Sequence, residues 1–151
     1  MKKLFVLVLV GLFLAGTAGL SLAAGTQEEA KAMVESAIAF MKANGKEKTL
    51  AELNNPKGKF VKGEVYVNAH NLDGTMLAHP INPKLVGTNL LEVPDPDGKF
   101  FRKDVMETGK TKPAGGWVDY KYKNPATGKI EQKTSFVKKG GDLIFVCGIY
   151  K

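Results

Sequence analysis

Residues 65–80 read VYVNAHNLDGTMLAHP, and the predicted architecture follows from this stretch. Its first half alternates apolar and more polar residues, the period of a strand that turns one face to a core. Asp73 and Gly74 follow, and Asp-Gly between alternating segments is a strong hairpin signal. The sequence therefore predicts a strand over residues 61–70, a tight turn, and a return strand over residues 75–79.

Upstream of the hairpin, helical spacing replaces alternation. Thr26 and Glu29 match the Ser/Thr-x-x-Glu pair that caps a helix amino terminus. The apolar stripe that follows at helical spacing consists of Ala30, Met33, Val34, Ala37, Ile38 and Met41. These features predict a helix over residues 27–43. A second capping pair, Thr49 and Glu52, predicts that a shorter helix begins there and ends before the next proline.

Downstream of the hairpin, the pattern changes again. Residues 80–98 carry four prolines and are predicted to form an irregular loop, and long loops in small domains are often functional. Residues 100–108 predict a short helix. Three further strands are predicted at residues 117–123, 129–138 and 143–150, and the short turns between them favour antiparallel pairing. The predicted class is α+β, with a long amino-terminal helix packed on a five-stranded antiparallel sheet and a helix-and-loop insertion.

The amino terminus has the layout of a secretory signal. Two lysines precede an apolar run that ends near Leu14, and small residues follow it. Because a membrane span needs about 20 apolar residues, cleavage is favoured, with Ser21 and Ala23 at the two small-residue positions. An uncleaved amino-terminal anchor is the alternative. The predicted organisation is a signal peptide over residues 1–23 and one domain over residues 24–151, located in the periplasm or secreted.

Charge and cysteine content narrow the classes of function. The formal charge of the 151 residues is +7, and loss of Lys2 and Lys3 with the signal peptide lowers it to +5. The lysines are dispersed, and Arg102 is the only arginine, so nucleic acid is not an expected partner. Cys147 is the only cysteine, which excludes an internal disulfide, a cysteine-based zinc site and covalently attached haem. No cofactor is expected.

The sequence contains few clusters of residues that could catalyse a reaction or bind a metal. His70 and His79 flank the hairpin turn without a third ligand at a recognised metal spacing, and His70 is predicted to be an exposed strand end. At His79, a fixed imidazole that donates a hydrogen bond to an anion and a purely structural role are equally open. Asp95 and Asp97 open a segment that lacks the further ligands of a calcium loop, so a plain turn is predicted. An enzyme is disfavoured, and no metal site is expected.

Alternation sorts the side chains of the last strands into two faces. Tyr120 shares a face with Tyr122, whereas Trp117 belongs to the opposite face. On the next strand Lys133 shares a face with Ser135. A lysine in mid-strand beside tyrosines is either solvated or directed into a pocket, where a carboxylate ligand would satisfy its charge. The pattern leaves both readings open.

Many of these residues form one longer ordered pattern. It consists of Tyr66-Val67, Asp73-Gly74, Ala78-His79-Pro80, Pro83, Leu85-Val86-Gly87, Asn89, Gly115-Gly116-Trp117-Val118, Tyr120, Asn124-Pro125, Lys133, Phe136-Val137 and Gly148-Ile149-Tyr150. Over about residues 27–150 the pattern resembles the single Cache domain family of bacterial extracellular sensors. The resemblance implies a PAS-like fold, in which a pocket lies between the antiparallel sheet and the helix-and-loop insertion.

The resemblance also implies a function. Family members bind small extracellular molecules, often short carboxylates such as acetate or pyruvate, and usually sit in chemoreceptors or histidine kinases. Carried onto this chain, it implies that Lys133 neutralises a carboxylate while His79 and Tyr120 orient it. Trp117 and Phe101 are the implied pocket walls. The first hypothesis is therefore a periplasmic sensor domain for a short organic acid, acting with a membrane receptor or histidine kinase.

Two positions depart from the family pattern. The last strand often carries tryptophan where Leu143 stands and a small residue where Val146 stands, so different packing behind the pocket is expected. These substitutions favour a second hypothesis, a structural or protein-interaction subunit with a degenerate pocket. Because the sequence stops at Lys151 without a signalling segment, signalling is expected to need a partner. A polar cavity lined by the implied site residues would favour the sensor hypothesis. A closed, dry cavity would favour the hypothesis of an interaction subunit.

Overall fold

The structure is a computed structural model that describes residues 24–151, so the predicted signal peptide lies outside the described residues. The helices are α1 (Gln27–Asn44), α2 (Lys46–Leu53) and α3 (Phe101–Thr111), with a short 3₁₀ helix, η1, at Pro83–Leu85. The strands are β1 (Val61–Lys62), β2 (Val65–Asn71), β3 (Met76–Ala78), β4 (Gly116–Lys123), β5 (Ile130–Gly140) and β6 (Leu143–Tyr150). They form one antiparallel sheet in the order β1-β2-β6-β5-β4, and β3 pairs with β2 on the edge opposite β6.

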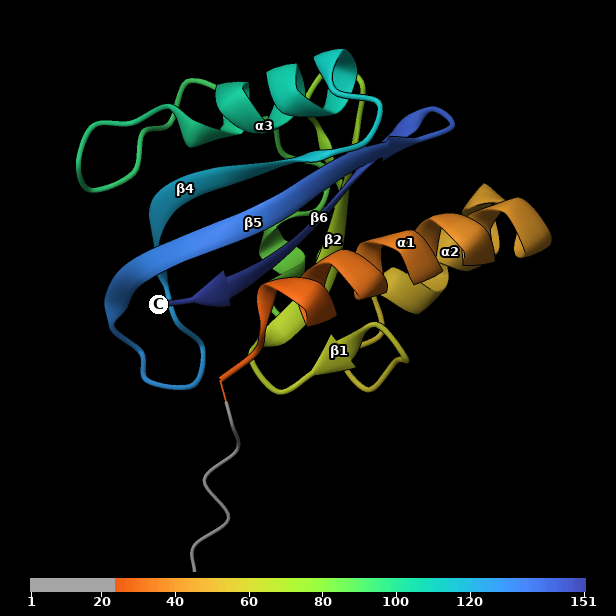
Figure 1. Ribbon diagram of the computed structural model, residues 1–151, viewed down its shortest axis with the longest axis horizontal. Coiled ribbons are helices and arrows are strands. Elements are labelled where there is room, and N and C mark those ends of the chain that lie inside the picture. The colour runs from red at the N-terminus through yellow and green to blue at the C-terminus, as the bar shows by residue number, and fades with distance from the viewer. Residues whose placement is uncertain (1–23) are drawn as a thin grey trace, which may run out of the picture.

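Both faces of this sheet are covered, as Figure 1 shows. On one face α1 packs through Val34 against Val67 of β2 and Phe145 of β6. On the other face α3 packs through Val105 against Val146 and its neighbours. Alternate residues of β2 therefore face two covered sides: Val67 and its apolar neighbours enter the α1 layer, whereas the more polar alternate residues face the α3 side. This explains why six of its seven residues are buried.

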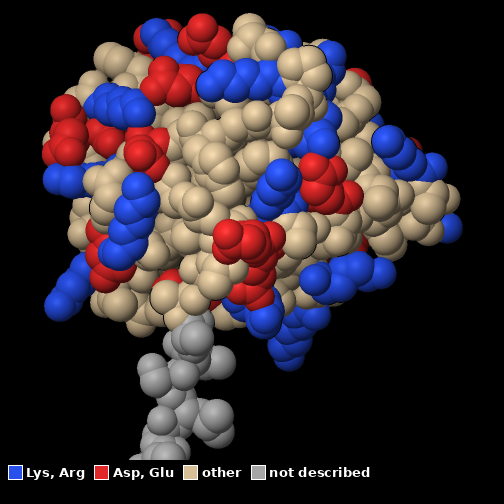
Figure 2. Space-filling model, in the orientation of Figure 1, with Lys and Arg blue, Asp and Glu red and all other residues tan. Residues whose placement is uncertain are grey.

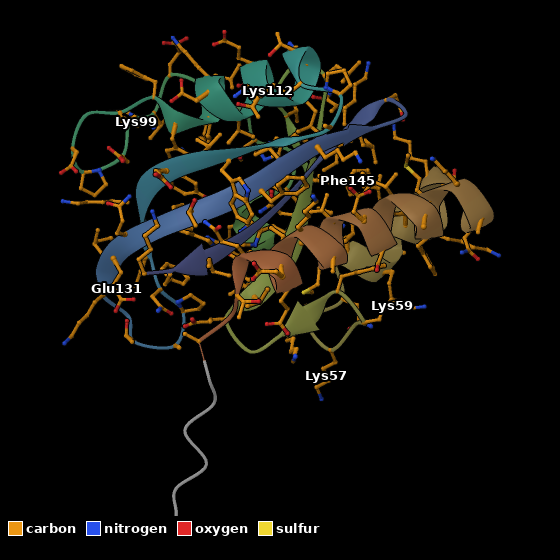
Figure 3. All side chains as sticks on the ribbon, viewed as in Figure 1. Lys57, Lys59, Lys99, Lys112, Glu131 and Phe145 are labelled. Carbon is orange, nitrogen blue, oxygen red and sulfur yellow. The ribbon has the colours of Figure 1, made fainter. Side chains whose placement is uncertain are left out.

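The amino-terminal helix α1 forms where the sequence predicts it. Thr26 Oγ1 accepts a hydrogen bond from Glu29 N at 3.1 Å, which caps the first turn. The Glu29 carboxylate forms an ion pair with Lys62 of β1. Figure 3 shows Phe145 inside the protein between β6 and α1, whereas Lys57 points away from it. The predicted amphipathic packing of this helix is confirmed.

Two predicted boundaries are wrong. The Thr49 and Glu52 pair does not begin α2, because the helix begins at Lys46 and Thr49 Oγ1 donates to the Gly45 carbonyl at 2.8 Å within it. The predicted strand over residues 61–70 is divided at Gly63, whose φ of 60° is accessible to glycine at little steric cost. The chain turns there and β1 pairs back on β2. The sheet consequently has six strands instead of the predicted five.

The segment between β3 and β4 covers the second face of the sheet. It contains the predicted loop over residues 80–98, which is tied to the sheet because Asp95 Oδ2 accepts a hydrogen bond from Lys121 N of β4 at 3.0 Å. The helix α3 continues past its predicted end through Gly109. At that point a Cβ atom would lie only 2.9 Å from Ile144 of β6, so the glycine permits the close approach of helix and sheet.

The surface carries charges of both signs. Figure 2 shows lysine and arginine interspersed with aspartate and glutamate over the visible face. Among residues 24–151, no helix combines the length and apolar character needed to cross a bilayer. The described chain is thus a sheet covered on two sides beneath a mixed-charge surface.

Candidate ligand-binding site

A small polar cavity lies on the α3 side of the sheet. Its volume is about 30 Å³, which is space for one or two water molecules. The lining consists of Tyr66, Asn68, His70, Met76, His79, Phe101, Arg102, Val105, Tyr120, Tyr122, Lys133 and Val146. This set includes two cationic residues and no aspartate or glutamate. The cavity is therefore suited to an anion.

Lys133 is the central charge of the cavity. It is only 2 % exposed, and its ammonium nitrogen donates weak hydrogen bonds to Tyr66 OH at 3.2 Å and Tyr150 OH at 3.4 Å. Burial lowers the pKa of Lys133 to about 8. No carboxylate in the described part of the chain lies within ion-pair distance of it. Its direct contacts are therefore neutral tyrosines, and the Glu64 carboxylate attracts it only from beyond ion-pair distance.

Gly148 explains how Lys133 reaches Tyr66. β6 lies between β5 and β2, with Tyr150 opposite Lys133 and Gly148 opposite Ser135. A Cβ atom on Gly148 would lie 2.4 Å from Lys133 Cε and 2.2 Å from Ser135 Oγ. The missing side chain leaves the gap through which the lysine crosses β6.

Two of the implied site residues form one aromatic wall. The rings of Phe101 and Tyr120 stack at a centroid distance of 4.0 Å and an interplanar angle of 6°. The Tyr120 hydroxyl shares a hydrogen bond of 2.8 Å with Ser135 Oγ, and burial raises the pKa of Tyr120 above its usual range. The structure thus brings Phe101 and Tyr120 to the same cavity as Lys133, although the Tyr120 hydroxyl already has a protein partner.

Both histidines line the cavity, and this corrects the prediction for His70. His70 is 6 % exposed instead of solvated, because α3 and the insertion cover the face of β2 on which it lies. Burial lowers the pKa of His70 to about 4. His79 Nδ1 accepts a hydrogen bond from Asn82 N at 3.0 Å, so the neutral ring carries its proton on Nε2. Burial, followed by the charge of Lys133, lowers the pKa of His79 to about 3.

Trp117 is not among the residues that line the cavity, so its implied role as a pocket wall is corrected. Its ring packs against Phe136 at a centroid distance of 5.3 Å, on the α1 face of the sheet. Alternation along β4 had placed it on the face opposite Tyr120. Of the two positions that depart from the family pattern, Val146 lines the cavity and Leu143 belongs to the α1 layer. Only Val146 therefore changes the pocket directly.

Sequence reasoning did not identify Arg102 and Asn68. Arg102 is only 8 % exposed. Its guanidinium donates a hydrogen bond to the Val93 carbonyl at 3.3 Å and lies 4.3 Å from the centre of the Phe101 ring. Within the described chain it has no carboxylate partner. Asn68 Oδ1 is buried without a hydrogen-bond partner. The single arginine in a lysine-rich chain was a signal that could have pointed to Arg102. Nothing marked Asn68, because alternation along its strand assigns it to the solvent-facing side.

The model of the family described as single Cache domain 2 matches residues 18–150. The chain belongs to this family. Cache sensor domains bind ligands without catalysing a reaction, and they face the extracellular or periplasmic side. The α+β fold and the resemblance inferred from the sequence are confirmed.

Similar domains occur in signalling proteins. The sensor histidine kinase MctS of Rhizobium johnstonii is 36 % identical over 72 residues, which are 48 % of this chain and only 15 % of the kinase. The solved periplasmic sensor domain of a chemotaxis protein has a TM-score of 0.65 at 26 % identity, over 82 % of this chain and 88 % of that one. A Cache chemosensory domain solved for carboxylic acid recognition has a TM-score of 0.63 at 24 % identity, over 82 % and 86 % of the chains, and shows the shared fold. The histidine kinase and the chemotaxis sensor domain support a ligand-sensing role for the Cache domain described above.

Proposed function

We propose that this Cache domain binds a short organic acid in the periplasm and acts with a membrane receptor or histidine kinase. The observation that carries the proposal is Lys133, an ammonium buried without a carboxylate in the described chain. Burial of an uncompensated charge is costly, and a ligand carboxylate would offset that cost. The similar Cache domain that recognises carboxylic acids supports the same class of ligand.

Under this proposal each polar group of the cavity has a part in binding. Lys133 would exchange its weak bonds to tyrosine hydroxyls for a charge-assisted bond to the carboxylate. Arg102 supplies a second cation, and His79 supplies the Nε2–H donor. Because the cavity has space for only one or two waters, a ligand of several heavy atoms requires α3 and its loop to move outward.

Thermal unfolding of the purified protein with acetate, propionate, pyruvate and lactate tests this proposal. A ligand that binds only the folded state raises the melting temperature, and at a concentration 100 times Kd it adds about 2.7 kcal/mol to the free energy of unfolding. Lys133→Met is expected to abolish the response. Lys139→Met removes an exposed lysine from the same strand and is the matched control, which should respond as the wild type does. An unresponsive wild-type protein, or a responsive Lys133→Met variant, contradicts the proposal.

The cellular location of the domain is part of the same proposal. The predicted signal peptide over residues 1–23 would deliver the domain to the periplasm, and the alternative is an uncleaved anchor. Amino-terminal sequencing of the exported protein distinguishes the two. Cleavage at the predicted site gives a chain that begins at Ala24, whereas an anchored chain keeps the apolar run.

The small volume of the cavity favours a second candidate function. In a protein-interaction subunit with a degenerate pocket, the cavity would have no ligand, and about 30 Å³ is consistent with that. Two buried cations are harder to explain under this alternative, because nothing would select for their retention. It predicts that none of the acids changes the melting temperature of the wild-type protein.

A further inference from the structure

Asn68 has hydrogen-bonding capacity that the protein does not use. It is 9 % exposed and lies on β2 between Tyr66 and His70, on the face that lines the cavity. Its amide oxygen Oδ1 is buried and has no partner in the described residues. Val146, which lies opposite it on β6, is apolar and cannot supply one. A buried acceptor of this kind is destabilising unless something donates to it.

The remaining polar groups of the cavity indicate what that donor is. Lys133, Arg102 and the Nε2–H of His79 are donors, and they suit a carboxylate. In the ligand-free protein the cavity has space for a water that donates to Asn68 Oδ1. A ligand that displaces this water has to supply a donor in its place, which is either a hydroxyl or an ammonium. An ammonium would lie beside two buried cations with no carboxylate in the lining, so like-charge repulsion disfavours it. A hydroxyl is the donor that fits.

The two subsites are close enough for one short ligand. Tyr66, whose hydroxyl accepts a hydrogen bond from Lys133 Nζ, and Asn68 are alternate residues on one face of β2. Alternate residues of a strand are separated by about 7 Å. A carboxylate at Lys133 and a hydroxyl at Asn68 can therefore belong to one molecule with a two- or three-carbon chain.

We propose that the ligand is a short 2-hydroxy acid, whose carboxylate binds Lys133 and whose hydroxyl donates to Asn68 Oδ1. The inference rests on the proposed function and narrows its ligand class. Asn68 is then a specificity-determining residue. It controls the preference for a hydroxylated acid over the same acid without the hydroxyl, while capture of the carboxylate depends on Lys133.

Calorimetric titration of the protein with matched pairs of acids tests the inference. Lactate and propionate differ by one hydroxyl, as do glycolate and acetate. Wild-type protein is expected to bind the hydroxylated member of each pair about tenfold to a hundredfold more tightly, the effect of one satisfied buried polar group. Asn68→Leu is expected to bring the ratio close to one with little change in propionate affinity. A merely structural role for Asn68 would weaken both members of a pair equally.

The outcomes separate this inference from the proposed function. Equal binding of lactate and propionate by wild-type protein overturns the inference and leaves a carboxylate sensor in place. Pyruvate is titrated beside the four acids, and binding of none of the five overturns the proposed function and the inference with it. If Asn68→Leu does not fold, Asn68→Ala is titrated in its place, and retention of the wild-type ratio in a folded variant also overturns the inference.

Discussion

Lys133 is a charged residue whose burial lowers the stability of the ligand-free protein. Burial lowers the pKa of Lys133 from 10.5 to about 8. Such a difference corresponds to about 3 kcal/mol of destabilisation of the folded state at neutral pH, where the lysine is charged. The unusual Gly148 beside it creates the space that the lysine needs. Under the proposed function, a bound carboxylate would offset this cost.

Replacement of Lys133 by methionine should stabilise the ligand-free protein while removing acid binding. At about pH 7 we expect a gain of about 1–3 kcal/mol in the free energy of unfolding, because a buried charge is replaced by an apolar chain of similar length. Between about pH 8 and 10.5 the unfolded chain keeps a proton that the folded wild type has lost, so wild-type stability rises with pH. The advantage of Lys133→Met should shrink there. Urea unfolding of wild type and variant at about pH 7 and about pH 10 measures this difference in stability. A variant that is less stable than wild type at neutral pH would contradict the argument.

Gly148→Ala should disturb the site and the fold together. The new Cβ would lie 2.2 Å from Ser135 Oγ and 2.4 Å from Lys133 Cε, so these side chains must shift. Overpacking of this kind costs about 1–3 kcal/mol. We expect a lower urea midpoint and weaker binding of short acids by calorimetry. Wild-type values for both quantities would show that the gap at Gly148 has no role.

The helix α3 and the loop before it together cover the cavity, and the most buried polar attachment of the loop to β4 is the carboxylate of Asp95. Asp95 Oδ1 accepts hydrogen bonds from Asp97 N and Lys99 N at 2.9 Å, and Oδ2 accepts one from Lys121 N of β4. This side chain therefore shapes the loop and fastens it to the sheet. The predicted plain turn at this position therefore has a structural role.

Removal of this attachment should loosen the cover. Asp95→Ala leaves three backbone donors without their acceptor, and we expect a loss of about 1–3 kcal/mol in stability and faster hydrogen exchange in α3. Asp97→Ala is the matched control. Its carboxylate makes only an exposed ion pair with Lys121, so its loss should cost about 0.5 kcal/mol or less. Equal effects of the two substitutions would argue against the attachment.

For the molecule as a whole, the covered second face of the sheet determines how stability responds to acid. His70 and His79 have pKa values of about 4 and about 3 in the folded protein, mainly because they are buried. In the unfolded chain both titrate near the usual value of about 6.5. The unfolded chain therefore binds more protons below that pH, and acid favours unfolding.

Stability should consequently fall as the pH is lowered from about 6.5 to 4, by up to about 1.4 kcal/mol per pH unit for each histidine. Urea unfolding across this range measures the slope. His70→Gln is expected to remove about half of the histidine contribution while the variant keeps its fold at neutral pH. A slope that is unchanged in this variant would show that His70 remains accessible to protons.

Elements that depend on nearby residues were predictable, whereas contacts across the sheet were not. The cap at Thr26, the Asp-Gly turn and the alternating last strands act over a few residues, and each appears as predicted. The early end of the first strand depends on one torsion, at Gly63, and the pattern did not reveal it. Family resemblance placed Lys133 in the site, but it also suggested Trp117, which alternation alone assigned to the other face.

The amino-acid pattern thus specified the helices, the strands and the side of each strand on which a residue lies, because these properties follow from local backbone periodicity. It did not specify what covers each side. His70 and Asn68 lie on a face that alternation assigns to solvent, and α3 covers that face from a distant part of the chain. The cavity, its two cations without an ion-pair partner in residues 24–151 and its unused amide oxygen arise from that packing, since burial depends on segments that meet only after folding.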